Sequence, residues 1–273
     1  MKYKLVISDF DGTLLRDDNT VSRRTVKAIR AYIDAGGVFT VSTGRMCKSI
    51  LMRLPDLGLD KISIPLMGYQ GAMIIDNLTN KRLFYRGLSS EDSIKIVKDC
   101  EKLGLYTQIY CGDEELYVAE YNYISEGYRK AAGVKAEAVG VLSEFLERTG
   151  YGCHKVLAVA EPERALEIMN DFNERYGSKY LCSVSHPTFV EIVNPEGGKG
   201  NAARFWAAEM GISMDEVIGI GDSLNDLPLI EAAGRRIAVA NARDELKAAA
   251  GEVSKYTNNE DAAARILEEI IKG

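Results

Sequence analysis

Two aspartates directly follow the first apolar segment of the chain. The segment Tyr3–Ser8 is apolar and β-branched, which predicts a buried strand, and Asp9 and Asp11 come immediately after it. Carboxylates two residues apart can face the same side, where they repel each other unless one stays protonated or a cation binds. A hard cation such as Mg²⁺ removes this conflict because it takes oxygen ligands. The pair therefore indicates a magnesium site, with a solvated acidic turn as the alternative.

A second group of polar residues lies late in the chain. Asp222 ends a predicted strand at 217–220, and Asn225 and Asp226 follow three and four residues later, in the first turn of a predicted helix. These three side chains are expected to converge on one place. Capping of the helix would explain one of them and not the whole set.

Two further segments could hold an anion. Thr43 and Gly44 follow the second predicted strand, Val38–Ser42, where a hydroxyl and exposed backbone N–H groups could hold phosphate oxygens. Ordinary turn chemistry is the alternative. Lys199 lies among glycines at the mouth of a predicted helix, whose N-terminus favours anions. The spacing is not that of a Walker A loop, and a solvated lysine in a flexible loop is the alternative.

The elements that must position these residues alternate between strands and helices. A helix that begins near Ser22 and stops at Gly36 separates the first two strands, so a right-handed crossover is expected. The same alternation returns near the C-terminus, and both ends of the chain are predicted to form one α/β doubly wound parallel sheet. The other expected strands are 62–66, 72–76, 82–85, 217–220 and 236–240, and the other expected helices are 45–54, 201–210, 224–232 and the C-terminal segment.

The middle of the chain shows a different pattern of predicted strands and helices. A helix at 90–103 precedes two strands, 105–111 and 115–120, that flank a hairpin signal at Gly112-Asp113. Helical segments and strands at 155–160 and 180–185 follow. The sequence thus predicts a core at 1–86 and 191–273, interrupted by an inserted α+β domain at 87–190.

Composition narrows the classes of function. The 273 residues include 34 Lys and Arg against 40 Asp and Glu, a net charge of −6, which argues against a nucleic-acid binder because phosphate contacts need clustered cations. No apolar run approaches the ~20 residues that cross a bilayer, so no membrane span is expected. The five cysteines are far apart and form no CxxC pair, which is typical of reduced thiols in a cytoplasmic protein.

In their order along the chain, these motifs resemble those of the haloacid dehalogenase (HAD) superfamily. The motifs are Asp-Phe-Asp-Gly-Thr at 9–13, Thr-Gly-Arg at 43–45, the glycine-flanked Lys199, and Gly-Asp-Ser-Leu-Asn-Asp at 221–226. The last motif continues as Leu-Pro-Leu-Ile and is similar to that of the Cof-type phosphatases, subclass IIB. The resemblance implies a Rossmann-like HAD core with a C2B-type cap as the insert.

The resemblance also implies a role for each motif. Asp9 would be the nucleophile that forms an aspartyl-phosphate, and Asp11 would be the general acid and then the general base. Thr43, the Gly44 N–H, Lys199 and Asn225 would hold the phosphoryl oxygens, and Lys199 would also orient Asp9 through an ion pair. Mg²⁺ would be bound by Asp9, the backbone carbonyl of Asp11 and Asp222, with Asp226 as a further ligand or a neighbour of the ligands.

The expected activity is hydrolysis of small phosphomonoesters, such as sugar phosphates or similar phosphorylated metabolites, by a monomer or a homodimer. Two alternatives stay open: phosphoryl transfer of the phosphomannomutase kind, and a non-catalytic binding protein on the same fold. The cap would close over the site as a lid. One position departs from the family pattern: many relatives have Asn-Gly-Ala where this chain has Gln70-Gly71-Ala72. His154 and His186 are expected to be structural.

Overall fold

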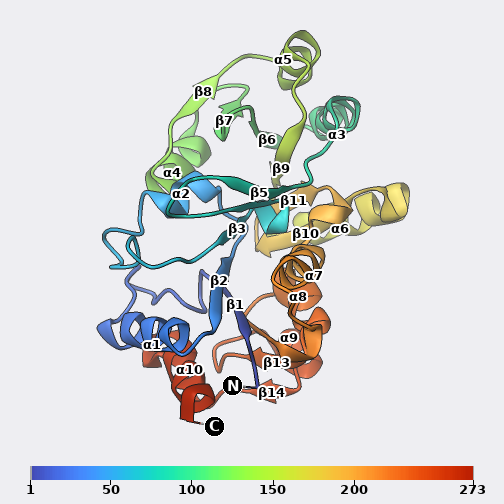
Figure 1. The fold of residues 1–273 in the computed structure, drawn as a ribbon. Helices are drawn as coiled ribbons and strands as arrows, with labels where there is room; N and C mark the ends of the chain where they lie inside the picture. Colours follow the sequence, from blue (N-terminus) through green and yellow to red (C-terminus); the bar gives the residue numbers. More distant parts are fainter. Residues whose placement is uncertain (1, 273) are drawn as a thin grey trace.

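Strand β1 (Leu5–Asp9) lies at the centre of the larger sheet and receives its partners from both ends of the chain (Figure 1). The computed structural model describes residues 2–272, the side chains of residues 131, 132 and 185 aside. The eight strands run in the order β14-β13-β12-β1-β2-β3-β4-β5, parallel from β14 to β3 and antiparallel from β3 to β5. The other strands are β2 (Val38–Ser42), β3 (Leu66–Gly68), β4 (Met73–Ile75), β5 (Arg82–Tyr85), β12 (Val217–Gly221), β13 (Arg235–Ala238) and β14 (Glu252–Val253).

Helices cover both faces of this sheet, which makes it the doubly wound α/β sheet that the sequence predicts (Figure 1). Val6 packs in the apolar cluster on one face, whereas Leu5 and Ile7 pack in the cluster on the other. Successive strand residues point to opposite faces, so a strand covered on both sides is apolar throughout. The helices are α1 (Arg23–Asp34), α2 (Cys47–Leu51), α7 (Lys199–Glu209), α8 (Leu227–Ala232), α9 (Asp244–Ala249) and α10 (Ala262–Lys272).

The insert forms a second domain above the core, with its own sheet and its own apolar cluster (Figure 1). Its six strands run in the order β10-β11-β9-β6-β7-β8 and pair antiparallel, except that β7 and β8 are parallel. We call this unit the cap. Its strands are β6 (Tyr106–Cys111), β7 (Glu115–Val118), β8 (Ala136–Ala138), β9 (Cys153–Val159), β10 (Leu181–His186) and β11 (Phe189–Val193), and its helices are α3 (Ser90–Lys102), α4 (Tyr123–Ala132), α5 (Leu142–Thr149) and α6 (Pro162–Tyr176).

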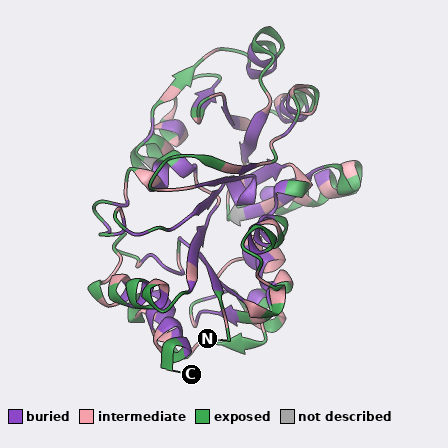
Figure 2. Ribbon diagram, viewed as in Figure 1, coloured by how far each residue is buried: buried purple, intermediate pink, exposed green. Residues whose placement is uncertain are grey.

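Burial follows the same plan in both units. Figure 2 shows the central strands of the core sheet as buried, while the edge strand β14 is exposed, β5 is only partly buried, and the helices expose their outer sides. In α1, Ser22 accepts a hydrogen bond from the Thr25 amide at 3.0 Å and so caps the helix. Among residues 2–272, no helix combines the length and the apolar composition that crossing a membrane requires.

Several expected boundaries differ from the observed ones. The boundary expected at 190/191 falls inside β11, which belongs to the cap sheet, so the second part of the core begins after Val193. The strand expected at 62–66 is instead β3, at Leu66–Gly68, and the helix expected at 45–54 is shortened to α2. The helix expected at 224–232 is divided into a 3-10 turn, η5 (Leu224–Asp226), and α8.

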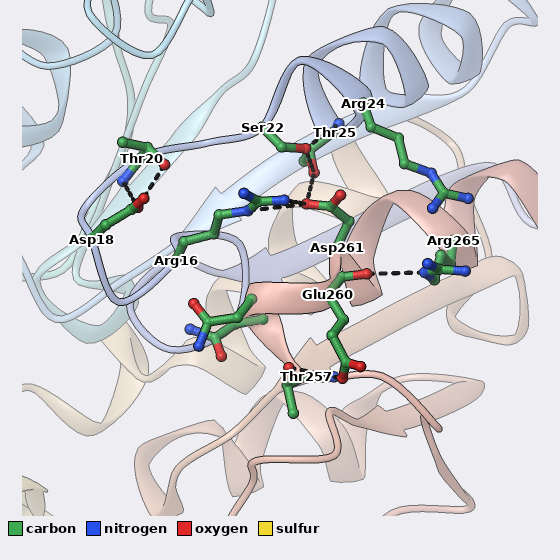
Figure 3. Close-up of polar contacts among 12 residues, drawn as sticks. Arg16, Asp18, Thr20, Ser22, Arg24, Thr25, Thr257, Glu260, Asp261 and Arg265 are labelled. Atoms are coloured by element: carbon green, nitrogen blue, oxygen red, sulfur yellow. Dashed lines mark hydrogen bonds and ion pairs between the residues drawn. The ribbon is translucent and has the colours of Figure 1, made fainter.

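The loop that follows β1 is tied to the beginning of α10 (Figure 3). Arg16 and Asp261 point toward each other, with 2.7 Å between Nη2 and Oδ1. Nearby, the Asn258 side chain donates to the carbonyl of Leu15 at 3.0 Å. These contacts hold in place the segment that leaves Asp9.

Candidate active site

Three parallel strands end side by side and bring the first predicted residues together. Asp9 is the last residue of β1, Thr43 follows β2, and Asp222 follows β12, with β1 between the other two. Ligands of doubly wound sheets bind at this carboxyl edge. Gly12 lets the chain turn here: its φ is 76°, and a Cβ on it would lie 2.7 Å from Asp222 Oδ2. A larger residue at position 12 would therefore displace Asp222.

Lys199 lies beneath Asp9 and joins it to the late acidic group. It is the first residue of α7, its side chain is 1% exposed, and its Nζ lies 2.7 Å from Asp9 Oδ1 and 2.6 Å from Asp226 Oδ1. The ion pair with Asp9 that the resemblance implies is therefore present. Lys199 does not line the cavity described below, so its charge acts on the site through these carboxylates.

Asp226 is fully buried and both of its oxygens are occupied. Oδ1 accepts a hydrogen bond from Lys199 Nζ, and Oδ2 accepts hydrogen bonds from the backbone N–H groups of Asp222 and Ser223, each at 3.1 Å. Asp222 in turn accepts a hydrogen bond from Thr13 Oγ1 at 2.9 Å. Asp226 thus fixes the turn that presents Asp222.

The carboxylates of Asp9, Asp222 and Asp226 form one acidic cluster, with one oxygen of each within 4.8 Å of the others. Three carboxylates face a single ammonium group, so the cluster carries excess negative charge when all are ionised. Its donors are all oxygen atoms, the type that Mg²⁺ takes. The residues present therefore fit a hard divalent cation. Asp11 does not contribute its side chain to this cluster.

Burial and repulsion act on the protons of this cluster. Burial, and then the charge of Asp226, raise the pKa of Asp9 well above its ordinary value and that of Asp222 to about 6. Burial opposes the charge of Lys199, but the carboxylates of Asp226 and Asp9 outweigh it and raise the pKa of the ammonium group. The cluster thus favours a bound cation or an extra proton.

We expect the gain in melting temperature on adding Mg²⁺ to increase as the pH rises from 5 to 7.5. The metal-free folded protein holds the Asp222 proton up to about pH 6, whereas the unfolded chain releases it near pH 4, so this group's stabilisation is complete below pH 4 and is lost as the pH rises through 6. Mg²⁺ bound at the acidic cluster would compete with that proton. Melting curves with Mg²⁺ and with EDTA test this.

The difference between the two samples is the quantity to compare. Burial lowers the pKa of His154 to about 4, which gives the opposite slope in both samples and cancels in the difference. Asp222→Asn removes one of the titrating carboxylates of the cluster and should reduce the dependence. A Mg²⁺ gain that stays constant in the original protein would contradict the assignment of Asp222.

Asp11 is turned away from the acidic cluster. Both of its oxygens pair with Arg45, with Nε to Oδ2 at 2.8 Å and Nη2 to Oδ1 at 2.6 Å. Its side chain is 46% exposed. The structure therefore places the expected general acid at the rim of the site, held by a guanidinium group.

A cavity of about 500 Å³ lies over this cluster and is lined by residues of both the core and the cap. The phosphate-binding candidates Thr43, Gly44 and Asn225 open on the same space as Asp9. His186, expected to be structural, also lines it, whereas His154 is buried and bonded to the Tyr85 hydroxyl at 2.8 Å. The cap contributes Gly127, Tyr128, Lys155, His186, Phe189 and Glu191.

Some lining residues were not predicted as site residues. Arg45 belongs to the Thr-Gly-Arg motif, and its position there was a usable signal. Lys155 and Glu191 are buried charges within strands β9 and β11, whose other residues are apolar apart from His154. Buried charges are rare unless paired, so a lone charge in an apolar strand is a second usable signal. Tyr128 and Phe189 carry no comparable signal.

Comparison with known proteins agrees with this geometry. The family described as haloacid dehalogenase-like hydrolase matches residues 6–267. A Haemophilus influenzae protein is 31% identical over 269 residues, with 98% of each chain covered. A Bacillus subtilis protein named 5-amino-6-(5-phospho-D-ribitylamino)uracil phosphatase is 28% identical over 291 residues, with 99% of each covered. A solved HAD subclass IIB sugar phosphatase shares the fold, with a TM-score of 0.81 at 19% identity over 98% of each chain.

Proposed function

Because the chain belongs to the haloacid dehalogenase-like hydrolase family, we propose that it is a Mg²⁺-dependent phosphatase acting through an aspartyl-phosphate intermediate. Its substrates would be small phosphomonoesters, such as sugar phosphates or similar phosphorylated metabolites. The observation that carries the proposal is the convergence of Asp9, Lys199, Asp222 and Asp226 below a cavity that Thr43 and Asn225 also line. The Bacillus subtilis relative, itself named a phosphatase, supports it.

The proposed first step is attack by an Asp9 carboxylate oxygen on phosphorus. A new O–P bond forms on Asp9 while the bond from phosphorus to the substrate's alcohol oxygen breaks. Lys199 holds the other side of the carboxylate at 2.7 Å, so the nucleophile is oriented before substrate arrives. In this step Asp11 gives a proton to the leaving alcohol oxygen.

In the second step Asp11 takes a proton from water, whose oxygen attacks phosphorus. The Asp9–phosphorus bond breaks, inorganic phosphate leaves and Asp9 returns to its carboxylate form. Asp11 is again protonated, so the cycle closes. To act in this way Asp11 must leave Arg45 and turn toward Asp9, since the two are paired in this structure.

The remaining residues would bind the phosphoryl group and the metal. Mg²⁺, held by Asp9, Asp222 and the backbone carbonyl of Asp11, would supply positive charge beside the phosphoryl oxygens. Both oxygens of Asp226 are occupied, so we assign it the role of holding Asp222 and Lys199 rather than the metal.

Thr43, the Gly44 N–H and Asn225 would donate hydrogen bonds to the phosphoryl oxygens, with Lys199 adding its charge from below. The leaving group would occupy the cap side of the cavity, where Tyr128 and Phe189 offer aromatic surface. All five cysteines are free and buried, which supports a reducing compartment, and we propose the cytoplasm.

Release of inorganic phosphate tests this function directly. We expect the protein to hydrolyse p-nitrophenyl phosphate and several sugar phosphates, and to lose at least ~100-fold of this activity in EDTA because the acidic cluster is then uncompensated. Added Mg²⁺ should restore it. An isomerised sugar phosphate without phosphate release would instead support the mutase. If neither phosphate nor an isomerised sugar phosphate is formed, the result would support a binding protein.

A further inference from the structure

One buried turn of the core has two successive non-glycine residues in the left-handed region, and it faces the cap. The 3-10 turn η1 (Tyr69–Gly71) follows β3, and Tyr69 and Gln70 have φ values of 52° and 61°. Both side chains are buried. Two successive non-glycine residues in the left-handed region are costly, and such strain persists only where surrounding contacts fix it. The contacts of these two side chains therefore show what the turn is for.

Each of the two side chains donates to a carboxylate of the cap. The Tyr69 hydroxyl donates to Glu114 Oε2 at 3.1 Å, at the hairpin between β6 and β7. The Gln70 amide nitrogen donates to Glu191 Oε2, on β11. The strained turn thus presents two donors to the docked cap.

Glu191 pairs with Lys155 of the cap, and Lys155 in turn contacts the loop that follows β2. Glu191 Oε1 lies 2.6 Å from Lys155 Nζ, and the same Nζ donates to the carbonyl of Gly44 at 2.7 Å. Both charged side chains are at most 4% exposed. Gly44 must be small here, because a Cβ on it would lie 2.5 Å from the Gln70 amide nitrogen. The cap therefore reaches the backbone of the loop that carries Thr43.

The other end of the Gln70 amide reaches the late motif. Since a carboxylate only accepts, the amide nitrogen must face Glu191, and the amide oxygen then accepts from Asn225 Nδ2 at 3.1 Å. This contact uses one N–H of the Asn225 amide and leaves the second for the cavity that Asn225 lines. One side chain thus links a cap carboxylate to a phosphate-binding candidate.

We propose that Gln70 is a positioning residue that couples the docked cap to Asn225, so that Asn225 is aimed at the phosphoryl group only when Glu191 is in place. This rests on the proposed function of Asn225. Asn tolerates left-handed φ values better than Gln. The side chain of an Asn at position 70 would be one methylene shorter than that of Gln, so we expect that it could not reach both Glu191 and Asn225. The departure from Asn at this position is therefore a matter of reach.

Gln70→Asn separates positioning from stability. We expect its affinity for inorganic phosphate, measured by calorimetry on the full Mg²⁺-loaded protein, to fall at least tenfold, while the melting temperature stays equal or rises. Its KM for p-nitrophenyl phosphate should rise by a similar factor. The matched control is Tyr69→Phe, which removes the donor to Glu114, keeps the ring, and leaves Asn225 untouched; its phosphate affinity should change less than threefold.

A double-mutant cycle with Asn225→Ala gives the decisive result. If Gln70 acts through Asn225, adding Gln70→Asn to Asn225→Ala produces no further loss of phosphate affinity. Full additivity, or wild-type affinity in Gln70→Asn alone, overturns the proposal. Phosphate binding is read without turnover, so a wild type that binds phosphate and hydrolyses no ester refutes the phosphatase and leaves this test intact. A wild type that binds no phosphate overturns the positioning role of Gln70, whereas the phosphatase is still judged by release of phosphate from esters.

Discussion

We expect the replacement of Asp9 by Asn to lower kcat by at least ~10⁴-fold without reducing the stability of the metal-free protein. The amide is no nucleophile toward phosphorus, so the covalent route is closed. Burial and the charge of Asp226 raise the pKa of Asp9 in the folded protein. At a pH above the ordinary pKa, Asp9 therefore lowers the stability of the folded state, and its replacement by Asn removes this cost. Lys199 keeps its partner Asp226. Phosphate release and urea unfolding in EDTA measure the two effects.

Asp34→Asn is the matched control for this variant. Asp34 is the last residue of α1 and exposed, and the same chemical change there should leave both kcat and stability unaltered. An Asp9→Asn variant that retains more than a tenth of the original kcat would refute the assignment of Asp9 as the nucleophile.

Replacing Lys199 by Met should destabilise the metal-free protein by about 3–5 kcal/mol at pH 7.5, because the buried carboxylates of Asp9 and Asp226 lose their cation. Activity should fall at least ~10³-fold as well, since Asp9 loses its orientation. The loss of stability should shrink at pH 5, where protonation of the cluster relieves the repulsion, and on addition of Mg²⁺. Urea unfolding at both pH values measures this.

Lys27→Met makes the same exchange on the exposed side of α1 and should cost less than ~0.5 kcal/mol. A Lys199→Met variant as stable as the Lys27→Met variant at pH 7.5 would show that the cluster does not need a buried cation. Equal losses at pH 5 and pH 7.5 would show that the cost lies in packing and not in charge.

The elements of the core were predictable where apolar runs are continuous and bounded by clear breaks. β1 and β2 follow from their sequences, and the alternation with α1 indicates the parallel crossover. β11 was missed because Glu191 interrupts its apolar run, and that omission put the domain boundary inside the strand. β8 and β14, three and two residues long, are too short to show a recognisable apolar pattern.

The candidate site divides in the same way. Asp9, Thr43 and Asp222 were predictable because each lies at the end of a strand or directly after it, and neighbouring parallel strands end at one edge. Lys199 was found from its glycines, but its burial between two carboxylates depends on how α7 begins. The contacts of Gln70 and Lys155 could not be predicted, because their partners come from separate units that meet only when the cap is docked. The pairing of Asp11 with Arg45 is likewise a matter of conformation.

The central position of β1 has a consequence for how the chain is made. β1 pairs with β12 in the register Leu5↔Val217, so its second partner is synthesised about 200 residues later, or roughly 10–40 s at ordinary ribosomal speeds. During that interval one edge of an apolar strand has no neighbour, and such an edge invites association with other nascent chains. The cap strands, contained between Tyr106 and Val193, are all complete before that partner emerges. We therefore expect the cap to fold before the core sheet that it covers is complete.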